Sequence, residues 1–276
     1  MVYIIDKAGS SELAEKNEID FEKIDRIITI SCTGFFAPGL DYELIKEFNI
    51  APGVKRTNIG FMGCAASLVG INSVWEAMQQ QRNENILMVS VELCSLHLQT
   101  EPTRDNILAN MIFADGAAAA YFSKSDSSNK RKLKIQFAES FLFEDSAKFM
   151  GWKIGNNGFE MMLSSELPKI ILNSAAPKAK EILAEKEIDI SKIKHWALHP
   201  GGRAILDSLQ NGLELSDEQL KPSRKVLLNF GNLSSVSILF VLKNILENSE
   251  LHKDDYLCAI AFGPGLTMEL VLFKVS

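Results

Sequence analysis

The sequence predicts a layered α/β protein, because two hydrophobic patterns alternate along its 276 residues. Short runs of apolar and β-branched residues are typical of strands, and several are apolar throughout, as in sheets covered on both faces. Longer stretches with apolar residues three or four positions apart are typical of helices that pack on such sheets. The predicted strands cover residues 26–31, 86–91, 117–122, 133–138, 196–198, 257–261 and 268–273.

Three segments show helical periodicity. One begins at Cys64 and continues to Met78, and the others cover residues 168–183 and 235–246. A further strand-like stretch ends near residue 61, and a helix is expected after residue 203. Each of the helices near Cys64 and Asn232 carries a motif and follows a strand, which is the pattern of an internal duplication.

The polar segment 124–130 lacks apolar periodicity and is the best candidate for an exposed connection. We therefore predict two halves, residues 1–123 and residues 131–276. Residues 1–20 read as the tail of a helix followed by a loop.

The composition is that of a globular protein, with 46% hydrophobic and 23% charged residues. The net charge of −6 and the scattered basic residues argue against a nucleic-acid partner. No apolar run is long enough to span a membrane, and the first residues do not resemble an export signal, so we expect a cytoplasmic protein. The four cysteines have no metal-ligand spacing, so we expect reduced thiols and no metal site.

Cys64 is the candidate nucleophile, because an extended stretch turns into a helix at this residue. Unpaired N–H groups and the helix dipole favour the reactive thiolate there, and the small residues Gly63, Ala65 and Ala66 leave room for an acyl chain. The alternative is a buried thiol that acts as a small hydrophobic side chain. We assign that role to the other three cysteines, Cys32, Cys94 and Cys258.

His199 and Asn232 lie in two further glycine-flanked motifs. His199 follows a short buried strand, where α/β sheets commonly bind ligands, and Asn232 lies between Gly231 and the next helix. Their alternative roles are a hydrogen-bonded structural histidine and a helix N-cap. A thiol, an imidazole and a carboxamide supply a nucleophile, a base and an oxyanion donor, so together the three residues predict a thioester-handling site.

These motifs resemble those of the type III polyketide synthases, the chalcone and stilbene synthase family of the thiolase-like superfamily. The resemblance covers nearly the whole chain and implies a layered α-β-α-β-α thiolase-like fold. The matching stretches are Cys32-Thr33-Gly34, Pro38-Gly39-Leu40-Asp41-Tyr42, Gly63-Cys64, Phe113-Ala114-Asp115-Gly116-Ala117-Ala118-Ala119, His199-Pro200-Gly201-Gly202, Gly231-Asn232-Leu233-Ser234-Ser235 and Gly263-Pro264-Gly265-Leu266-Thr267.

The resemblance implies an acyltransferase that uses CoA thioesters as substrates and needs no further cofactor. Cys64 would hold the acyl group of an acyl-CoA starter, with His199 as the neighbour that keeps the sulfur ionised. His199 and Asn232 would bind the thioester carbonyl of malonyl-CoA during decarboxylation, and the extended chain would then cyclise. The family also implies a homodimer.

Further site residues follow from the same resemblance. Phe113 matches an aromatic gatekeeper between the CoA tunnel and the reaction cavity, although core packing explains it equally well. Met161 aligns with a second gatekeeper that is usually phenylalanine, and its flexibility favours a longer or aliphatic starter. Glu92 and Ser234 are expected in a hydrogen-bond network behind Cys64. The remaining positions are those that would approach the pantetheine arm, Gly201, Gly202 and Ala204, and those that would shape the cavity, Gly263, Pro264 and Gly265.

The chain departs from the family in length. Members usually carry roughly a hundred further residues before the matched part, including basic residues that bind CoA phosphates, so the N-terminal half is expected to be incomplete. Two alternatives stay open: a β-ketoacyl synthase that performs a single extension, and a truncated, non-catalytic thiolase-like subunit. A cysteine hydrolase is disfavoured by the apolar, glycine-lined surroundings of Cys64.

Overall fold

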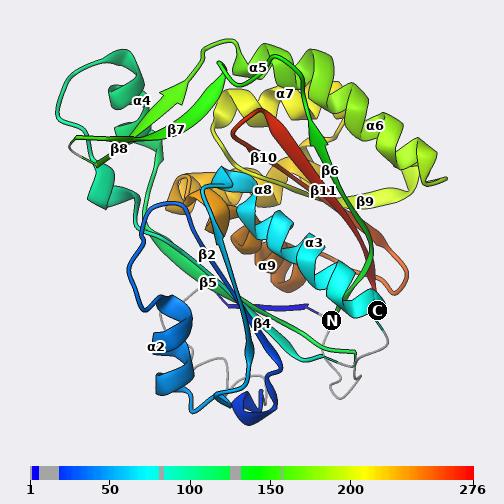
Figure 1. Ribbon diagram of the computed structural model, residues 1–276. Coiled ribbons are helices and arrows are strands. Elements are labelled where there is room, and N and C mark those ends of the chain that lie inside the picture. Colours follow the sequence, from blue (N-terminus) through cyan, green and yellow to red (C-terminus); the bar gives the residue numbers. More distant parts are fainter. Residues whose placement is uncertain (1, 6–18, 81–83, 125–131, 157) are drawn as a thin grey trace.

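Two mixed β-sheets and three layers of helices make up the molecule in the order α-β-α-β-α (Figure 1). The computed structural model describes residues 2–5, 19–80, 84–124, 132–156 and 158–276. Most of the predicted connection 124–130 lies outside these residues. No helix in the described part of the chain combines the length and apolarity needed to cross a bilayer.

The first sheet has five strands in the order β1-β5-β4-β2-β3. Strands β2, β3 and β4 are parallel, whereas β5 is antiparallel to both β4 and β1. The carboxyl ends of the parallel strands meet at one edge, where ligand sites of α/β proteins form. The strands are β1 (Val2–Ile5), β2 (Arg26–Ser31), β3 (Lys55–Gly60), β4 (Ile86–Glu92) and β5 (Gly116–Phe122).

The second sheet has the order β6-β11-β10-β9, with β10 parallel to β9 and antiparallel to β11. In its register Ala259 of β10 lies between Ala197 of β9 and Val271 of β11. A separate antiparallel pair, β7 and β8, forms a hairpin outside both sheets. The bounds are β6 (Leu133–Leu142), β7 (Met150–Gly155), β8 (Gly158–Leu163), β9 (Ile193–Leu198), β10 (Tyr256–Gly263) and β11 (Thr267–Val275).

Helices α3 (Ala66–Gln79) and α9 (Ser237–Asn248) form the central layer, and each contacts strands of both sheets. Helix α2 (Leu40–Glu47) covers the outer face of the first sheet, and α6, α7 and α8 cover the second. The remaining helical elements are η1 (Phe21–Lys23), η2 (Gly63–Ala65), η3 (Cys94–His97), α4 (Arg104–Ile112), α5 (Leu167–Ile170), η4 (Ile171–Ala175), α6 (Ala176–Glu185), η5 (Ile190–Lys192), α7 (Arg203–Leu213), α8 (Asp217–Phe230) and η6 (Ser234–Val236).

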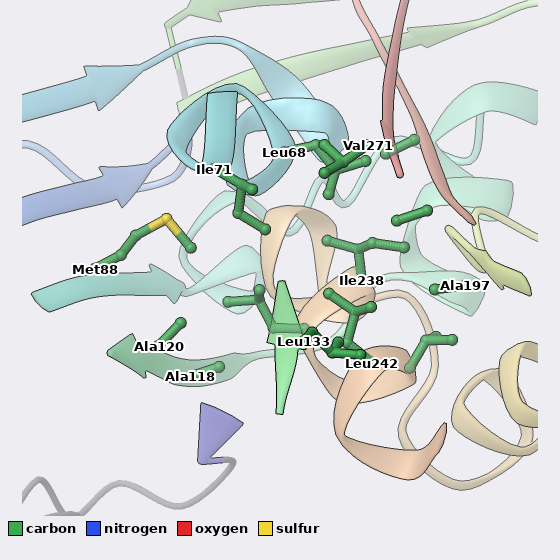
Figure 2. Close-up of a cluster of buried hydrophobic side chains, with 14 of the residues drawn as sticks. Leu68, Ile71, Met88, Ala118, Ala120, Leu133, Ala197, Ile238, Leu242 and Val271 are labelled. Atoms are coloured by element: carbon green, nitrogen blue, oxygen red, sulfur yellow. The ribbon is translucent and has the colours of Figure 1, made fainter. Parts of the chain in front are cut away.

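The main core lies where the two central helices meet the sheets (Figure 2). Leu68 of α3 and Leu242 of α9 are fully buried there, between Met88 of the first sheet and Val271 of the second. Burial of one such side chain stabilises the fold by about 1.5–3 kcal/mol. The predicted halves, residues 1–123 and 131–276, both contribute side chains to this apolar interior.

All seven predicted strands and the three main predicted helices are confirmed, with bounds extended by a few residues. The expectation of a helix tail at the start of the chain is wrong for Val2–Ile5, which form β1 and pair with β5. The physical reason is their run of β-branched and aromatic residues, which favours an extended edge strand. The sequence did not reveal α2, α4, α8 or the β7–β8 hairpin.

Candidate active site

Cys64 lies in the tight turn η2 that leads into α3, as the sequence predicts. The first residue of this turn must be a glycine, because Gly63 has φ +63° and a Cβ there would lie 2.3 Å from Cδ of Pro264. The Cys64 thiol is buried and donates a 3.8 Å hydrogen bond to Oγ of Ser234. The candidate nucleophile therefore contacts a residue that lies 170 positions away in the sequence.

Burial raises the pKa of the Cys64 thiol to about 12, and the nearby Glu92 charge adds to this effect. Hydrogen bonds from Ser234 and Asn232 act in the opposite direction but do not outweigh the loss of solvation. Burial therefore favours the neutral thiol when no ligand is bound, and the expected thiolate stays a prediction. The position at the start of α3 does not compensate for removing the sulfur from water.

His199 follows β9 and is held by its backbone N–H, which donates to the Ile260 carbonyl of β10 at 2.9 Å. Both ring nitrogens are buried, and neither has a hydrogen-bond partner among the described residues. Burial lowers the pKa of His199 to about 3, so the imidazole is neutral. A buried imidazole with free nitrogens is available to a ligand, because unsatisfied polar atoms are costly unless something binds them.

The Asn232 carboxamide is oriented by its own loop. Its Oδ1 accepts from the Ser234 N–H at 2.9 Å, and its Nδ2 lies 3.5 Å from the Gly201 carbonyl. The bond to the Ser234 N–H, the first of η6, is a capping interaction, in line with the alternative role of Asn232, although Leu233 occupies the N-cap position itself. The bond to Ser234 uses the carboxamide oxygen, so the N–H₂ group is the part that can donate, and Asn232 lines the same cavity as His199.

Two cavities meet at Cys64 and share four lining residues, Cys64, Phe113, Met150 and Met161. The cavity of about 290 Å³, here called the entry cavity, is also lined by residues that the sequence singled out, His199, Gly201, Gly202, Ala204 and Asn232. The cavity of about 370 Å³, here called the reaction cavity, is lined by Ser234 and Pro264 among others. Phe113 and Met161 thus lie where the two cavities meet, and their gatekeeper role stays a prediction.

Gly263 and Gly265 line neither cavity. A Cβ on Gly263 would lie 2.6 Å from the Met62 carbonyl, so this glycine lets β10 pack against the turn that carries Cys64. Gly265 has φ +128°, which other residues rarely adopt. Within this loop, only Pro264 faces the reaction cavity.

Two family models match the chain with this arrangement of residues. The model for the C-terminal domain of chalcone and stilbene synthases matches residues 134–276, and a model for FAE1/type III polyketide synthase-like proteins matches residues 4–141. The chain belongs to the type III polyketide synthase family. Its layered architecture is accordingly the thiolase-like fold of that family.

Related sequences agree with this assignment. The chain is 32% identical to the alpha-pyrone synthesis polyketide synthase-like protein Pks18 of Mycobacterium tuberculosis over 92% of its length, and it spans 65% of that relative. It is also 32% identical to a putative chalcone synthase of Bacillus subtilis, with 93% of this chain and 72% of the relative covered.

Solved structures show the same fold. The 1,3,6,8-tetrahydroxynaphthalene synthase of Streptomyces coelicolor superimposes with a TM-score of 0.90 at 29% identity, over 96% of this chain and 75% of that one. PKS-I of the brown alga Ectocarpus siliculosus gives a TM-score of 0.87 at 34% identity, over 94% of this chain and 71% of that one.

A buried acidic network underlies the type III polyketide synthase site. The Glu92 carboxylate accepts from the Thr33 hydroxyl at 2.7 Å, from the Cys32 N–H at 3.0 Å and from the Ser235 hydroxyl. Burial raises the pKa of Glu92. The predicted network therefore exists, but its serine is Ser235, whereas Ser234 bonds to Cys64.

The wall of the reaction cavity was not predicted from the sequence. His97, Trp152 and Phe159 line it together with Met150 and Met161, and four of these five residues come from the β7–β8 hairpin. The available signal was an alternation of large side chains, at Met150 and Trp152 and again at Phe159 and Met161, on short glycine-flanked segments.

Proposed function

We propose that the chain is an acyltransferase that condenses malonyl-CoA units onto an acyl-CoA starter held on Cys64, followed by cyclisation of the polyketide. The observation that supports this most directly is the place of Cys64 where the entry and reaction cavities meet. A thiol there reaches a CoA thioester from one side and a growing chain from the other.

Loading begins with proton transfer, because the thiol and the imidazole are both neutral at rest. His199 takes the proton of Cys64 as the sulfur attacks the starter carbonyl. The carbon–sulfur bond to CoA then breaks, and the departing CoA sulfur receives the proton. In this sequence of steps the thiolate forms only when a substrate is bound. The empty site therefore does not have to hold a buried charge.

Extension uses the carboxamide and the imidazole as donors. Malonyl-CoA loses carbon dioxide, and the electron pair of the broken carbon–carbon bond forms an enolate whose oxygen is held by Asn232 and His199. One such donor contributes about 2.7–4 kcal/mol to transition-state stabilisation in acyl-transfer sites. The enolate carbon attacks the acyl group on Cys64 and releases the sulfur.

The starter proposed is a fatty or aromatic acyl-CoA, with an aliphatic preference that follows from Met161. Thioether side chains adapt to flexible ligands, and the entry and reaction cavities are both lined mainly by apolar groups. One relative is named for alpha-pyrone synthesis and another for tetrahydroxynaphthalene, so the product is not fixed by family membership.

We also propose a homodimer that forms along β3. This strand is the edge of the first sheet, and Phe35 and Phe36 beside it are 50% and 60% exposed. An unpaired edge next to exposed aromatic rings is a suitable surface for a second copy. The cytoplasmic location and the division into residues 1–123 and 131–276 stay predictions.

Mass spectrometry of the intact protein after incubation with mixed acyl-CoAs tests the proposal. We expect one added acyl mass on the wild type and none on Cys64→Ala, whereas the control Cys94→Ala, which removes another thiol of the reaction cavity, is still loaded. Loading that survives in Cys64→Ala contradicts the proposal. With malonyl-CoA added, a product from one extension alone supports a β-ketoacyl synthase, and a wild type that is never loaded supports a non-catalytic subunit.

A further inference from the structure

The β7–β8 hairpin pairs with no strand of the two main sheets in the part of the chain that the structure describes. It forms a two-stranded sheet of its own, and in Figure 1 it lies with α4 at one edge of the molecule. It nevertheless supplies Met150, Trp152, Phe159 and Met161 to the reaction cavity. The position of the hairpin therefore sets the shape of this cavity.

The His97 ring connects the hairpin to the first sheet through both nitrogens. Nδ1 accepts from the Phe159 N–H at 3.1 Å, and Nε2 lies 2.5 Å from the Thr33 carbonyl. Because a carbonyl can only accept, Nε2 must carry the proton and donate it, which leaves Nδ1 free to accept. Only the neutral Nε2–H tautomer makes both bonds.

The same ring also packs against the hairpin. It stacks on Phe159 with 4.2 Å between ring centroids and 12° between planes, and it meets the edge of Trp152 at 5.8 Å. Trp152 adds a second link, since its Nε1 donates to the Cys32 carbonyl at 2.8 Å. The hydrogen bonds from His97 and Trp152 thus end on the carbonyls of Thr33 and Cys32, two neighbouring residues that directly follow β2.

The hairpin turn is shaped for this contact. Gly158 begins β8 with φ +111°, and a Cβ there would lie 3.1 Å from Nδ1 and 3.5 Å from Cα of His97. A larger residue would push the ring away from the Phe159 N–H. The close contact between the hairpin and His97 therefore depends on the glycine at position 158 as well as on the histidine side chain.

We propose that His97 is a positioning residue that fixes the hairpin wall and thereby determines which starter acyl groups the reaction cavity accepts. This inference rests on the proposed function of Cys64. Loss of the ring's two hydrogen bonds frees the wall to move outward, and the cavity then accepts longer starters. Because His97 itself lines the cavity, its variants can change the loading of every starter, and the effect is therefore read as the ratio of long to short starters.

The test compares three variants of His97 across a series of acyl-CoAs of increasing chain length. His97→Phe keeps the ring but loses both hydrogen bonds, His97→Asn keeps an acceptor in place of Nδ1, and His97→Gln keeps a donor in place of Nε2. We expect kcat/KM for long relative to short starters to rise about tenfold in His97→Phe and less in His97→Asn and His97→Gln. His252→Phe, at a histidine whose side chain is 63% exposed, is the matched control and leaves the ratio unchanged.

A second readout does not depend on activity. Hydrogen exchange at the Phe159 amide is expected to be faster in His97→Phe than in wild type or in His97→Asn, because the amide has lost its acceptor. The inference is wrong if the wild type loads Cys64 but His97→Phe changes neither the exchange rate of the Phe159 amide nor the ratio of kcat/KM for long and short starters. Failure of the wild type to load Cys64 overturns the proposed function instead, and the exchange result then still decides whether His97 holds the hairpin.

Discussion

The Cys64 sulfur and the His199 ring are both uncharged in the resting site, because each has lost most of its contact with water. A charge on either alone would be costly in this interior, but a proton passed from the thiol to the imidazole creates two opposite charges at once. Under the proposed function, Cys64 and His199 therefore become reactive together, when a polar thioester binds. The Asn232 carboxamide is oriented by the Ser234 N–H, so its N–H₂ group can donate a hydrogen bond before and after this proton transfer.

Alkylation with iodoacetamide tests the neutral thiol. Since the pKa of Cys64 is raised to about 12, the thiolate fraction rises tenfold per pH unit across pH 6–9, and the alkylation rate of Cys64 should rise in proportion. The rate at each pH is measured by peptide mass spectrometry, with His199→Gln as the comparison. A rate that levels off above pH 7 would show a thiolate already formed at rest.

The three reactive side chains were predictable at the residue scale because each has glycine or small residues beside it and a strand before it. The ionisation states of Cys64 and His199 were not predictable, since they depend on burial by segments that are distant in the sequence. Glu92 illustrates the same limit: its presence in a network was foreseen, but Ser235 rather than Ser234 is its partner because adjacent residues in η6 face opposite sides.

At the scale of elements, the strands that fill the two sheets were predictable because their apolar runs are buried by layers on both faces. The β7–β8 hairpin was not, since it pairs with neither sheet; Met150 and Leu163 pack with the core of the second sheet, but Trp152 and Phe159 line a cavity instead. Helix α8 was missed because it contains Pro222 and many polar residues; its start is stabilised by the capping box of Ser216 and Gln219.

The turn η2 offers a test at this scale. Gly63→Ala places a Cβ 2.3 Å from Pro264 at a residue with φ +63°, so the turn must shift and Cys64 with it. We expect loading of Cys64 to fall at least tenfold and the free energy of unfolding to fall by about 1–3 kcal/mol. Gly53→Ala is the control, because a Cβ there meets nothing within 4 Å.

Both quantities are measured on the same samples, by intact-mass loading kinetics and by urea unfolding. We expect slower loading and lower stability together, because both follow from the same shift of the backbone at residue 63. Full loading in a Gly63→Ala protein of normal stability would show that the glycine is not required for the geometry of the nucleophile.

At the scale of the whole molecule, the site depends on how the two halves meet. Cys64 comes from the first half, and His199 and Asn232 come from the second. Backbone bonds join them: the Asn232 N–H donates to the Ile112 carbonyl at 2.7 Å, and its own carbonyl accepts from the Ala114 N–H at 2.9 Å. Phe113, which lines both cavities, lies between these two bonds, so residues distant in the sequence hold the boundary between the cavities.

The proposed dimer is tested at the same scale. Phe36→Glu adds a charge next to the β3 edge and should reduce the sedimenting mass from twice that of the 30.6 kDa chain to that of a single chain. Leu228→Glu, at an 84% exposed leucine of α8 in the outer helix layer, is the control and should leave the dimer intact. A wild type that sediments as a single chain at micromolar concentration would contradict the dimer.

The separate pairing of the β7–β8 hairpin has a consequence for how the cavity could change during evolution. Under the proposed function, Cys64, His199 and Asn232 carry out the reaction, and Trp152 and Phe159 of the hairpin contact the substrate. Met150 and Leu163 pack with the core and hold the hairpin in place. Substitutions at Trp152 and Phe159 would then alter which substrates fit without altering the reaction, and exchanging residues 150–163 between relatives is a direct test.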